Sequence, residues 1–195
     1  SFKGTERRTS RQIISRMESV GGDLNAFTGK EETVYYCTCQ REHFARAMDL
    51  LFDVVFNSTY PQEEMNKEVE VVIDEIESYK DSPSELIYDD FENLVFEGSS
   101  LAMPILGTKK TLRRISKSPA IALDWMQTHY RPERMVLFVL GNVTTKQVIA
   151  AAEMAQKGFS AAEIVEKIKA GRDAVRASFV VDTLTYLHRG GRCSS

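Results

Sequence analysis

The sequence predicts an α+β fold in which several helices cover a small mixed or antiparallel sheet. Capping signals followed by apolar residues at helical spacing recur along the chain, and short runs rich in Val, Thr, Tyr and Phe lie between them. The chain has 195 residues, of which 43% are hydrophobic and 27% charged. These values are typical of a globular protein that buries a core, so a disordered or fibrous class is not favoured.

The first third of the chain is expected to contain a helix, a hairpin and a second helix. Thr9 and Gln12 form a capping-box pattern ahead of apolar residues at helical spacing. Residues 24–28 and 33–39 are rich in Thr, Val, Tyr and Phe and flank a short turn, which predicts two paired strands. Residues 41–56 again place apolar side chains at helical spacing, so a second helix follows.

The middle of the chain is expected to be helical. A proline follows a serine cap at the start of two segments, where its fixed φ and missing N–H suit the first helical turn. In one of them, Ser82 and Glu85 form a capping box. A loop that contains Gly and Ser follows the helical segment at residues 83–96 and leads to residues 105–108. The expected helices span residues 61–80, 83–96, 109–115 and 119–130.

The last third is expected to add a strand and a helix–strand–helix segment. The continuous apolar run at residues 135–140 has the length of a strand, and we expect it to be covered on both faces. Thr144 and Gln147 form a capping box for a helix that ends near Gly158. The remaining elements are a helix capped by Ser160 and Glu163, a strand at residues 177–181 and a helix end with a glycine turn at residues 186–192.

The composition argues against two classes of partner. The formal net charge is -3 and the chain has no long stripe of Lys and Arg, which disfavours nucleic acid. The longest strongly apolar run, residues 135–140, is far shorter than the roughly 20 residues that span a bilayer. We therefore expect a cytoplasmic protein that binds neither nucleic acid nor membrane.

The three cysteines do not make a disulfide framework in a chain of this length. Cys37 and Cys39 are two residues apart in an alternating segment, so they share one face of a strand. Together with His43 they form a C-x-C-x3-H pattern that could hold a metal, but no second ligand pair matches it. Buried thiols in a reducing cytoplasm are the favoured interpretation.

Glu68 and Glu75 are seven residues apart, or two helical turns, so they stand on one face of the expected helix. Carboxylates at the edge of an apolar stripe are candidates for metal ligation or for a shifted pKa. The alternative is a solvated acidic face, and spacing alone favours it. Other acidic residues crowd the same helix, namely Glu63, Glu64, Glu70, Asp74 and Glu77.

The order of motifs resembles the pitrilysin, insulinase and mitochondrial processing peptidase family, the inverted zincins. In that family an H-x-x-E-H helix and a distant glutamate hold zinc, and zinc-activated water attacks a peptide carbonyl. The resemblance covers residues 1 to about 148. Its pieces are Ser1-Phe-Lys-Gly-Thr, Gly21-Gly22-Asp-Leu-Asn25-Ala26-Phe27-Thr28, Glu32-Thr33-Val-Tyr35-Tyr36, Glu68 with Glu75, Pro104 to Thr108, Tyr130 to Met135 and Gly141-Asn142-Val143.

The resemblance implies roles for five residues. Glu75 is the third zinc ligand and Glu68 the carboxylate that supports it. Asn25, Ala26 and Phe27 lie on an edge strand beside the zinc, which pairs with an extended peptide substrate while its aromatic side chain lines a pocket. A second homologous peptidase half is the expected protein partner.

The family's H-x-x-E-H helix would end immediately before Ser1. Two histidine ligands and the general base would then lie outside the chain, which starts with neither Met nor a signal peptide. The three histidines present are isolated in the sequence and do not supply a helical ligand pair. We therefore expect a fragment of a metallopeptidase that binds no zinc and is inactive by itself.

Residues beyond 148 resemble a different family. Ala152 to Ser160 and Phe179 to Arg192 are similar to the DegV family of fatty-acid-binding proteins, in which this segment joins two lobes. The expected domains are therefore a truncated metallopeptidase-like domain at residues 1–148 and a partial DegV-like segment at residues 149–195. A non-catalytic protein that binds peptide at its edge strand or lipid at the DegV-like segment is the alternative function. The codons upstream of Ser1 would distinguish the two functions: H-x-x-E-H would support the metallopeptidase, and a start codon or an unrelated sequence would support the binding protein.

Overall fold

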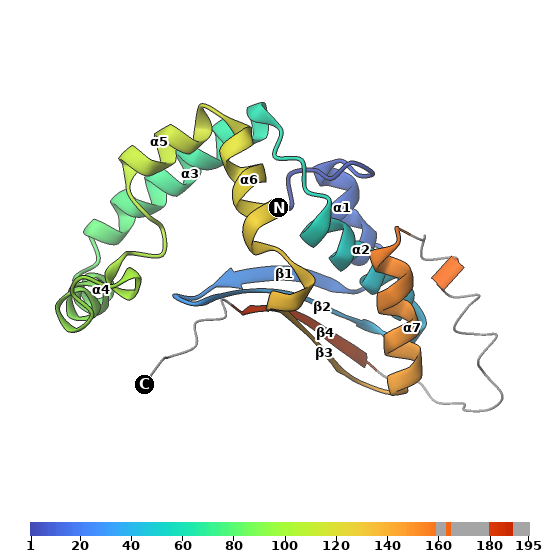
Figure 1. The fold of residues 1–195 in the computed structure, drawn as a ribbon. Coiled ribbons are helices and arrows are strands. Elements are labelled where there is room, and N and C mark those ends of the chain that lie inside the picture. The colour runs from blue at the N-terminus through green and yellow to red at the C-terminus, as the bar shows by residue number, and fades with distance from the viewer. Residues whose placement is uncertain (159–162, 165–179, 189–195) are drawn as a thin grey trace. The chain divides into compact units, whose positions relative to one another are not determined.

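The computed structural model describes residues 1–158, 163–164 and 180–188 of the chain (Figure 1). The chain divides into two compact units. We call the first, residues 1–27, 32–59 and 129–195, the sheet unit, and the second, residues 28–31 and 60–128, the helical unit. Helices and an antiparallel sheet in one chain confirm the predicted α+β class.

Within the described residues the sheet has four strands, in the order β1-β2-β4-β3. The strands are β1 (Asp23–Thr28), β2 (Glu32–Gln40), β3 (Met135–Leu140) and β4 (Val180–His188). Strand β4 is antiparallel to both β2 and β3. Residues 29–31 alone connect β1 to β2, which is too short for a parallel crossover, so this pair is an antiparallel hairpin. The predicted hairpin and the strand at residues 135–140 are confirmed.

The end of the chain differs from the prediction. Residues 186–188, expected to be a helix end, belong to β4. They pair with residues 32–34 of β2, and Tyr186 and Leu187 also pair with Val136 and Met135 of β3. Hydrogen bonding to strands on both sides satisfies this backbone, and such long-range pairing leaves no trace in local sequence. Residues 177–179, where we expected the strand to begin, and Ser160, the expected cap, lie outside the described residues.

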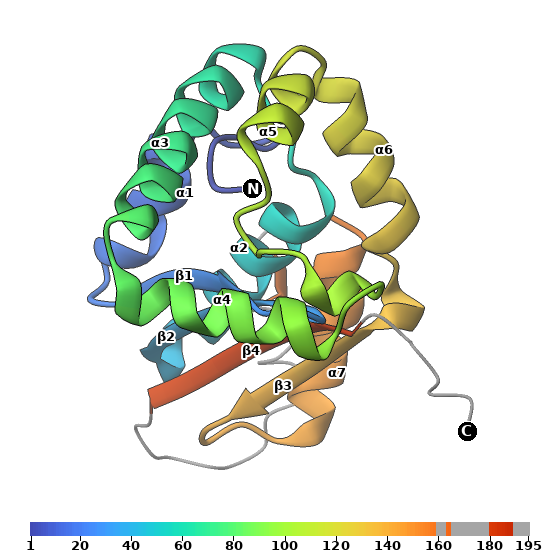
Figure 2. The same ribbon diagram turned by 90° about the vertical axis from the view of Figure 1, so that its left-hand side faces the viewer.

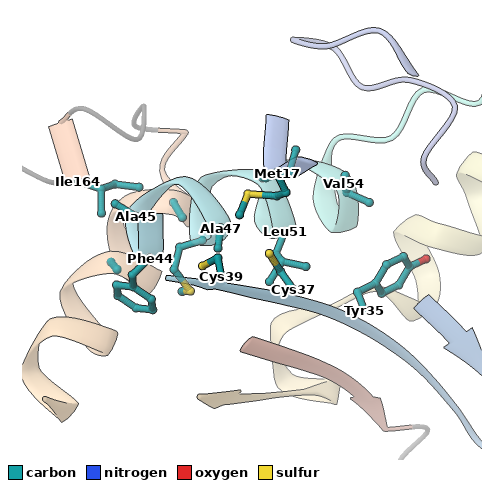
Figure 3. Packing of buried hydrophobic residues seen from close by; sticks show 14 of the residues in the cluster. Met17, Tyr35, Cys37, Cys39, Phe44, Ala45, Ala47, Leu51, Val54 and Ile164 are labelled. Atoms are coloured by element: carbon teal, nitrogen blue, oxygen red, sulfur yellow. The ribbon is translucent and has the colours of Figure 1, made fainter. Parts of the chain in front are cut away.

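Among the helices whose bounds the structure describes, three cover one face of the sheet (Figures 1 and 3). They are α1 (Ser10–Glu18), α2 (Phe44–Phe56) and α7 (Thr145–Gln156). Fully buried side chains from these helices meet Cys37 of β2 in one core, including Met17, Leu51 and Ala151. The capping boxes predicted at the starts of α1 and α7 are both present, and α7 ends just before Gly158 as expected.

Among the described residues, strand β3 is covered on one face and its other face is exposed, which contradicts the prediction that both faces are covered. Its odd-numbered residues pack against the core. Val136, Phe138 and Leu140 are 53%, 50% and 59% exposed. A short continuous apolar run is compatible with one covered face or two, and the described helices of the sheet unit lie on a single side.

The helical unit contains the other predicted helices (Figure 2). Helices α3 and α4 follow one another, and α5 packs beside α3. Ser82 precedes α4 as expected, but its side chain makes no capping hydrogen bond. No helix in the described ranges is both long and apolar enough to cross a membrane. The bounds are α3 (Gln62–Lys80), α4 (Pro83–Val95), α5 (Lys109–Ser116) and α6 (Pro119–His129), and short 3-10 helices occupy Arg41–His43, Ser100–Ala102 and Pro132–Arg134.

The predicted boundary between residues 148 and 149 falls inside α7. The helix is continuous from Thr145 to Gln156, and its small residues Ala151 and Ala155 are buried in the core of the sheet unit. The division of the chain into two domains at this position stays a prediction.

Candidate functional site

Helix α3 carries the two glutamates predicted for the metal site. The helix is unbroken from Gln62 to Lys80, so Glu68 and Glu75 stand on one side of it, two turns apart. Its buried stripe consists of Met65, Val69 and Ile73. Glu68 lies beside this stripe and is half-buried, whereas Glu75 is exposed. The carboxylate of Glu75 is therefore open to a ligand.

Three of the other acidic residues of α3, Glu63, Glu64 and Glu77, form ion pairs with lysines. Lys67 Nζ lies 3.1 Å from Glu63 and 2.9 Å from Glu64, and hydrogen bonds to these two carboxylates raise the pKa of Lys67. Glu77 pairs with Lys109 at 2.6 Å and Lys80 at 3.0 Å, which lowers the pKa of Glu77. Among the described residues, no ion pair involves Glu75. The acidic face predicted as the alternative is thus a real feature of α3, but Glu75 is not part of its ion pairs.

Strand β1 carries the residues predicted for substrate pairing. It is the edge strand on its side of the described sheet. The side-chain Oδ1 of Asn25 accepts a hydrogen bond from the backbone N–H of Ala26 at 2.8 Å. Phe27 is 55% exposed, and its ring centre lies 6.4 Å from that of Tyr36. An exposed edge strand with an exposed aromatic side chain suits peptide recognition by strand addition.

The predicted site residues are divided between the two units. Glu68 and Glu75 belong to the helical unit, and Asn25, Ala26 and Phe27 belong to the sheet unit. Within each unit the structure brings the predicted residues together, on one helix face and on one strand. Their roles as ligand, support and substrate contact stay predictions.

The described side chains do not complete a zinc site. A catalytic zinc takes three protein ligands and one open position. Two carboxylates from a single helix are chemically suitable ligands, but no group of three or more His, Cys, Asp or Glu side chains in the described ranges could hold a metal. No catalytic step can be assigned to zinc with these residues alone.

The cysteines and histidines lie in separate places. Cys37 and Cys39 are 0% and 3% exposed in the core, which agrees with buried thiols. His43 Nε2 lies 3.4 Å from a carboxylate oxygen of Glu42. His129 Nδ1 lies 3.4 Å from Nη1 of Arg134. The described C-x-C-x3-H residues therefore form no metal cluster.

A buried ion-pair network was missed by the sequence analysis. Asp49 and Asp53 are 0% exposed on α2, and both carboxylates accept hydrogen bonds from Arg7 and Arg8. Thr5 Oγ1 also donates to Asp53 at 2.7 Å. We call Thr5, Arg7, Arg8, Asp49 and Asp53 the N-terminal clasp. Two aspartates at i and i+4 in a helix whose other residues, apart from Arg46, are apolar were the available signal.

The clasp determines the ionisation of Asp53. Burial by itself would raise the pKa of this carboxyl group. Hydrogen bonds from Thr5, Arg8 and Arg7 outweigh burial and hold the pKa below its ordinary value of 3.8. Asp53 is therefore charged in the folded protein at neutral pH, with its charge balanced by the two arginines.

Comparison with known families agrees with this arrangement of motifs. Residues 1–109 match the insulinase family, peptidase family M16, and residues 140–195 match the DegV family of uncharacterised proteins. Because the first match covers more than half of the chain, the protein belongs to the insulinase family.

Individual relatives bear the names of zinc proteases and processing peptidases. An uncharacterized zinc protease of Rickettsia bellii is 39% identical over 153 residues, which are 78% of this chain and 37% of the relative. The uncharacterized zinc protease YmxG of Bacillus subtilis is 38% identical over 143 residues, 73% of this chain and 34% of the relative. The mitochondrial-processing peptidase subunit beta of Caenorhabditis elegans is 34% identical over 153 residues, 78% of this chain and 33% of the relative. The matched part of this chain thus spans about a third of each relative.

Proposed function

We propose that this chain is part of a zinc-dependent metalloendopeptidase of the pitrilysin and insulinase class. The observation that carries the proposal is the family match over residues 1–109, which includes both glutamates of α3. When bound in such an enzyme, zinc lowers the pKa of a water molecule and polarises the peptide carbonyl. The histidines and the general base of an H-x-x-E-H motif are not among the residues given, so the test below adds that motif.

In this proposal Glu75 contributes one anionic oxygen to the metal, and Glu68 orients the ligand face of α3. Their two-turn spacing supports these roles, because it keeps both carboxylates on one side of a rigid helix. The exposure of Glu75 supports the first role, since a metal and a second helix need access to it.

The substrate is proposed to be an extended peptide that adds to the outer edge of β1, which is the edge strand of the described sheet. Strand addition requires backbone N–H groups at the edge of the sheet. The backbone N–H of Ala26 donates a hydrogen bond to the side-chain oxygen of Asn25. An incoming carbonyl would replace Asn25 Oδ1 as the acceptor. Phe27 would contact the side chain of the bound peptide. The proposed protein partner is a second homologous peptidase half, in keeping with the name of the relative called a subunit beta.

The test is to place an H-x-x-E-H helix directly before Ser1 and to measure zinc affinity by competition with a chelator. Glu75→Gln should lose most of the bound zinc, because an amide is a poor substitute for an anionic ligand. Glu68→Gln should weaken binding by about 10 to 100-fold, as losses of supporting partners typically do. Glu70→Gln, on the same helix and exposed, is the control and should bind as the unmodified extended chain does. Equal zinc binding by the extended chain and its Glu75→Gln variant would refute the proposal.

A second candidate function is lipid binding without catalysis. It is favoured by the match of residues 140–195 to the DegV family. Isothermal titration calorimetry of the chain with a long-chain fatty acid tests this second function. Saturable binding of one fatty acid per chain would support this candidate, and the absence of binding would remove it.

A further inference from the structure

Strand β3 has an open edge and, beside it, an exposed apolar face. It is the last strand on its side of the described sheet, at the border opposite β1 (Figure 1). Its residues 135–140 pair with β4 on the inner side only, so within the described ranges the backbone groups that point outward have no partner strand. Val136, Phe138 and Leu140, each at least half exposed, lie along this edge. Backbone groups and apolar side chains that suit a further strand are therefore available together.

Strand β3 lacks the features by which natural edge strands avoid pairing. Such strands are commonly protected by charged side chains, by proline or by a bulge. All 6 residues of β3 are apolar, and none of them is charged or proline. The register with β4 runs from residue 135 to residue 140 without a skipped position, so this ladder contains no bulge. The other edge strand, β1, carries the polar residues Asp23, Asn25 and Thr28. The edge of β3 is therefore the one without protection against a further strand.

A second copy of β3 is complementary to this edge. In an antiparallel pair, directly opposite side chains point to the same face of the sheet. A two-fold axis through Phe138 places Val136 opposite the partner's Leu140 and Phe138 opposite the partner's Phe138, so the exposed apolar strips of the two copies become continuous. Just outside the strand, Arg134 lies opposite the partner's Asn142, and no like charges meet. A register shifted by one residue would place the strip of one copy beside the core-facing side chains of the other.

We infer that β3 pairs with β3 of a second copy of this chain, in an antiparallel contact centred on Phe138 that joins the two sheets. The pairing satisfies the outward backbone groups of both strands and brings aromatic and aliphatic side chains together across the axis. Because β3 carries no charge, it offers nothing to a charged peptide or to anionic lipid, whereas an identical strand matches it residue by residue. The inference uses residues of the sheet unit alone and is independent of the proposed peptidase function.

The experiment measures the mass of the whole chain in solution by analytical ultracentrifugation, with a reducing agent present so that no disulfide joins two chains. The parent should sediment at twice 22.1 kDa and return to 22.1 kDa on dilution. Phe138→Lys and Phe138→Glu should each be monomeric, because each places two like charges opposite one another at the axis. Phe91→Lys is the matched control: Phe91 is 62% exposed on α4, and its replacement should leave the dimer intact.

A mixture of the two charged variants separates loss of the contact from loss of the fold. Equal amounts of Phe138→Lys and Phe138→Glu should form a mixed dimer, because opposite charges then face each other at the axis. We expect the mixed dimer to be tighter by about tenfold than the self-association of either variant. In the parent, amide hydrogen exchange at residues 135–140 should slow as the protein concentration rises, since the outward N–H groups become hydrogen-bonded in the dimer.

Four results would overturn the inference. One is a parent chain that stays at 22.1 kDa at every concentration. A dimer that survives both charged substitutions of Phe138 would place the contact elsewhere, and a mixture of the two variants that stays monomeric would exclude the pairing around Phe138. A monomeric parent that binds vesicles of neutral phosphatidylcholine, and loses this binding in Phe138→Lys, would assign the exposed strip to a lipid surface instead.

Discussion

Asp53→Asn is expected to destabilise the sheet unit strongly. Both oxygens of Asp53 accept hydrogen bonds, one from Arg7 and Asn57 and the other from Thr5 and Arg8. Whichever oxygen the amide nitrogen replaces, a donor then faces two donors in a buried position. The arginines also lose one of the two charges that balance them.

The size of the effect follows from the burial of the pair. Removing one partner of a buried ion pair costs about 3–5 kcal/mol of the free energy of unfolding. Asp49 remains as a partner for both arginines, so we expect the lower end of this range, about 3 kcal/mol. For a chain of this size each kcal/mol lowers the melting temperature by about 2–4 °C, which gives a decrease of about 6–12 °C.

Urea unfolding followed by far-ultraviolet circular dichroism measures this change. Asp74→Asn, at an exposed position of α3, is the control and should lie within about 0.5 kcal/mol of the parent. A loss below about 0.5 kcal/mol for Asp53→Asn would refute the view that the clasp stabilises the fold.

The pH dependence provides a further check on Asp53. Hydrogen bonds that overcome the opposing effect of burial hold its folded-state pKa below 3.8. A carboxyl group with a lowered folded-state pKa stabilises the fold fully above its unfolded-state pKa, about 3.9, and this stabilisation is lost as the pH falls through the folded-state value. The stability difference between the parent and Asp53→Asn should therefore be constant near neutral pH and narrow below about pH 4. A difference that widens on acidification would contradict the assigned direction of the pKa shift.

Two further predictions concern other contacts. Gly22→Ala should lower the free energy of unfolding by about 1–3 kcal/mol, because a Cβ at this position would lie 2.9 Å from the carbonyl oxygen of Thr38. Urea unfolding measures this loss, and an unchanged free energy of unfolding would contradict the close contact. Lys109→Met should raise the pKa of Glu77 towards its ordinary value, because Lys109 contributes most to lowering this pKa. NMR titration measures the change, and an unchanged Glu77 pKa would show that the ion pair is not formed in solution.

Local signals in the sequence predicted most of the helices. The capping boxes at Thr9 and Thr144 mark the starts of α1 and α7 as observed, and Pro83 and Pro119 begin α4 and α6. These signals work because a capping side chain or a proline acts on backbone groups within one turn. Their effect does not depend on what the helix packs against.

Local sequence did not predict which strands pair with each other or which faces of the strands are covered. Residues 135–140 were correctly predicted as a strand, but their composition did not indicate that Val136, Phe138 and Leu140 would be exposed. The pairing of residues 186–188 with β2 and β3 was missed, since the glycines that follow them suggested a helix end. Both features depend on segments far away in the chain.

The candidate site shows the same division. The sequence by itself placed Glu68 and Glu75 on one helix face, because two helical turns separate them whatever the tertiary structure is. It also placed Cys37 and Cys39 on one side of a strand. Only the tertiary structure decided that Glu75 stays outside the ion pairs of α3 among the described residues, and that Arg7 and Arg8 close on Asp49 and Asp53. Helical and strand periodicity are properties of a short backbone segment, so the sequence alone determines them. An ion pair between residues more than 40 positions apart forms only when the tertiary packing brings the two charges within reach of each other.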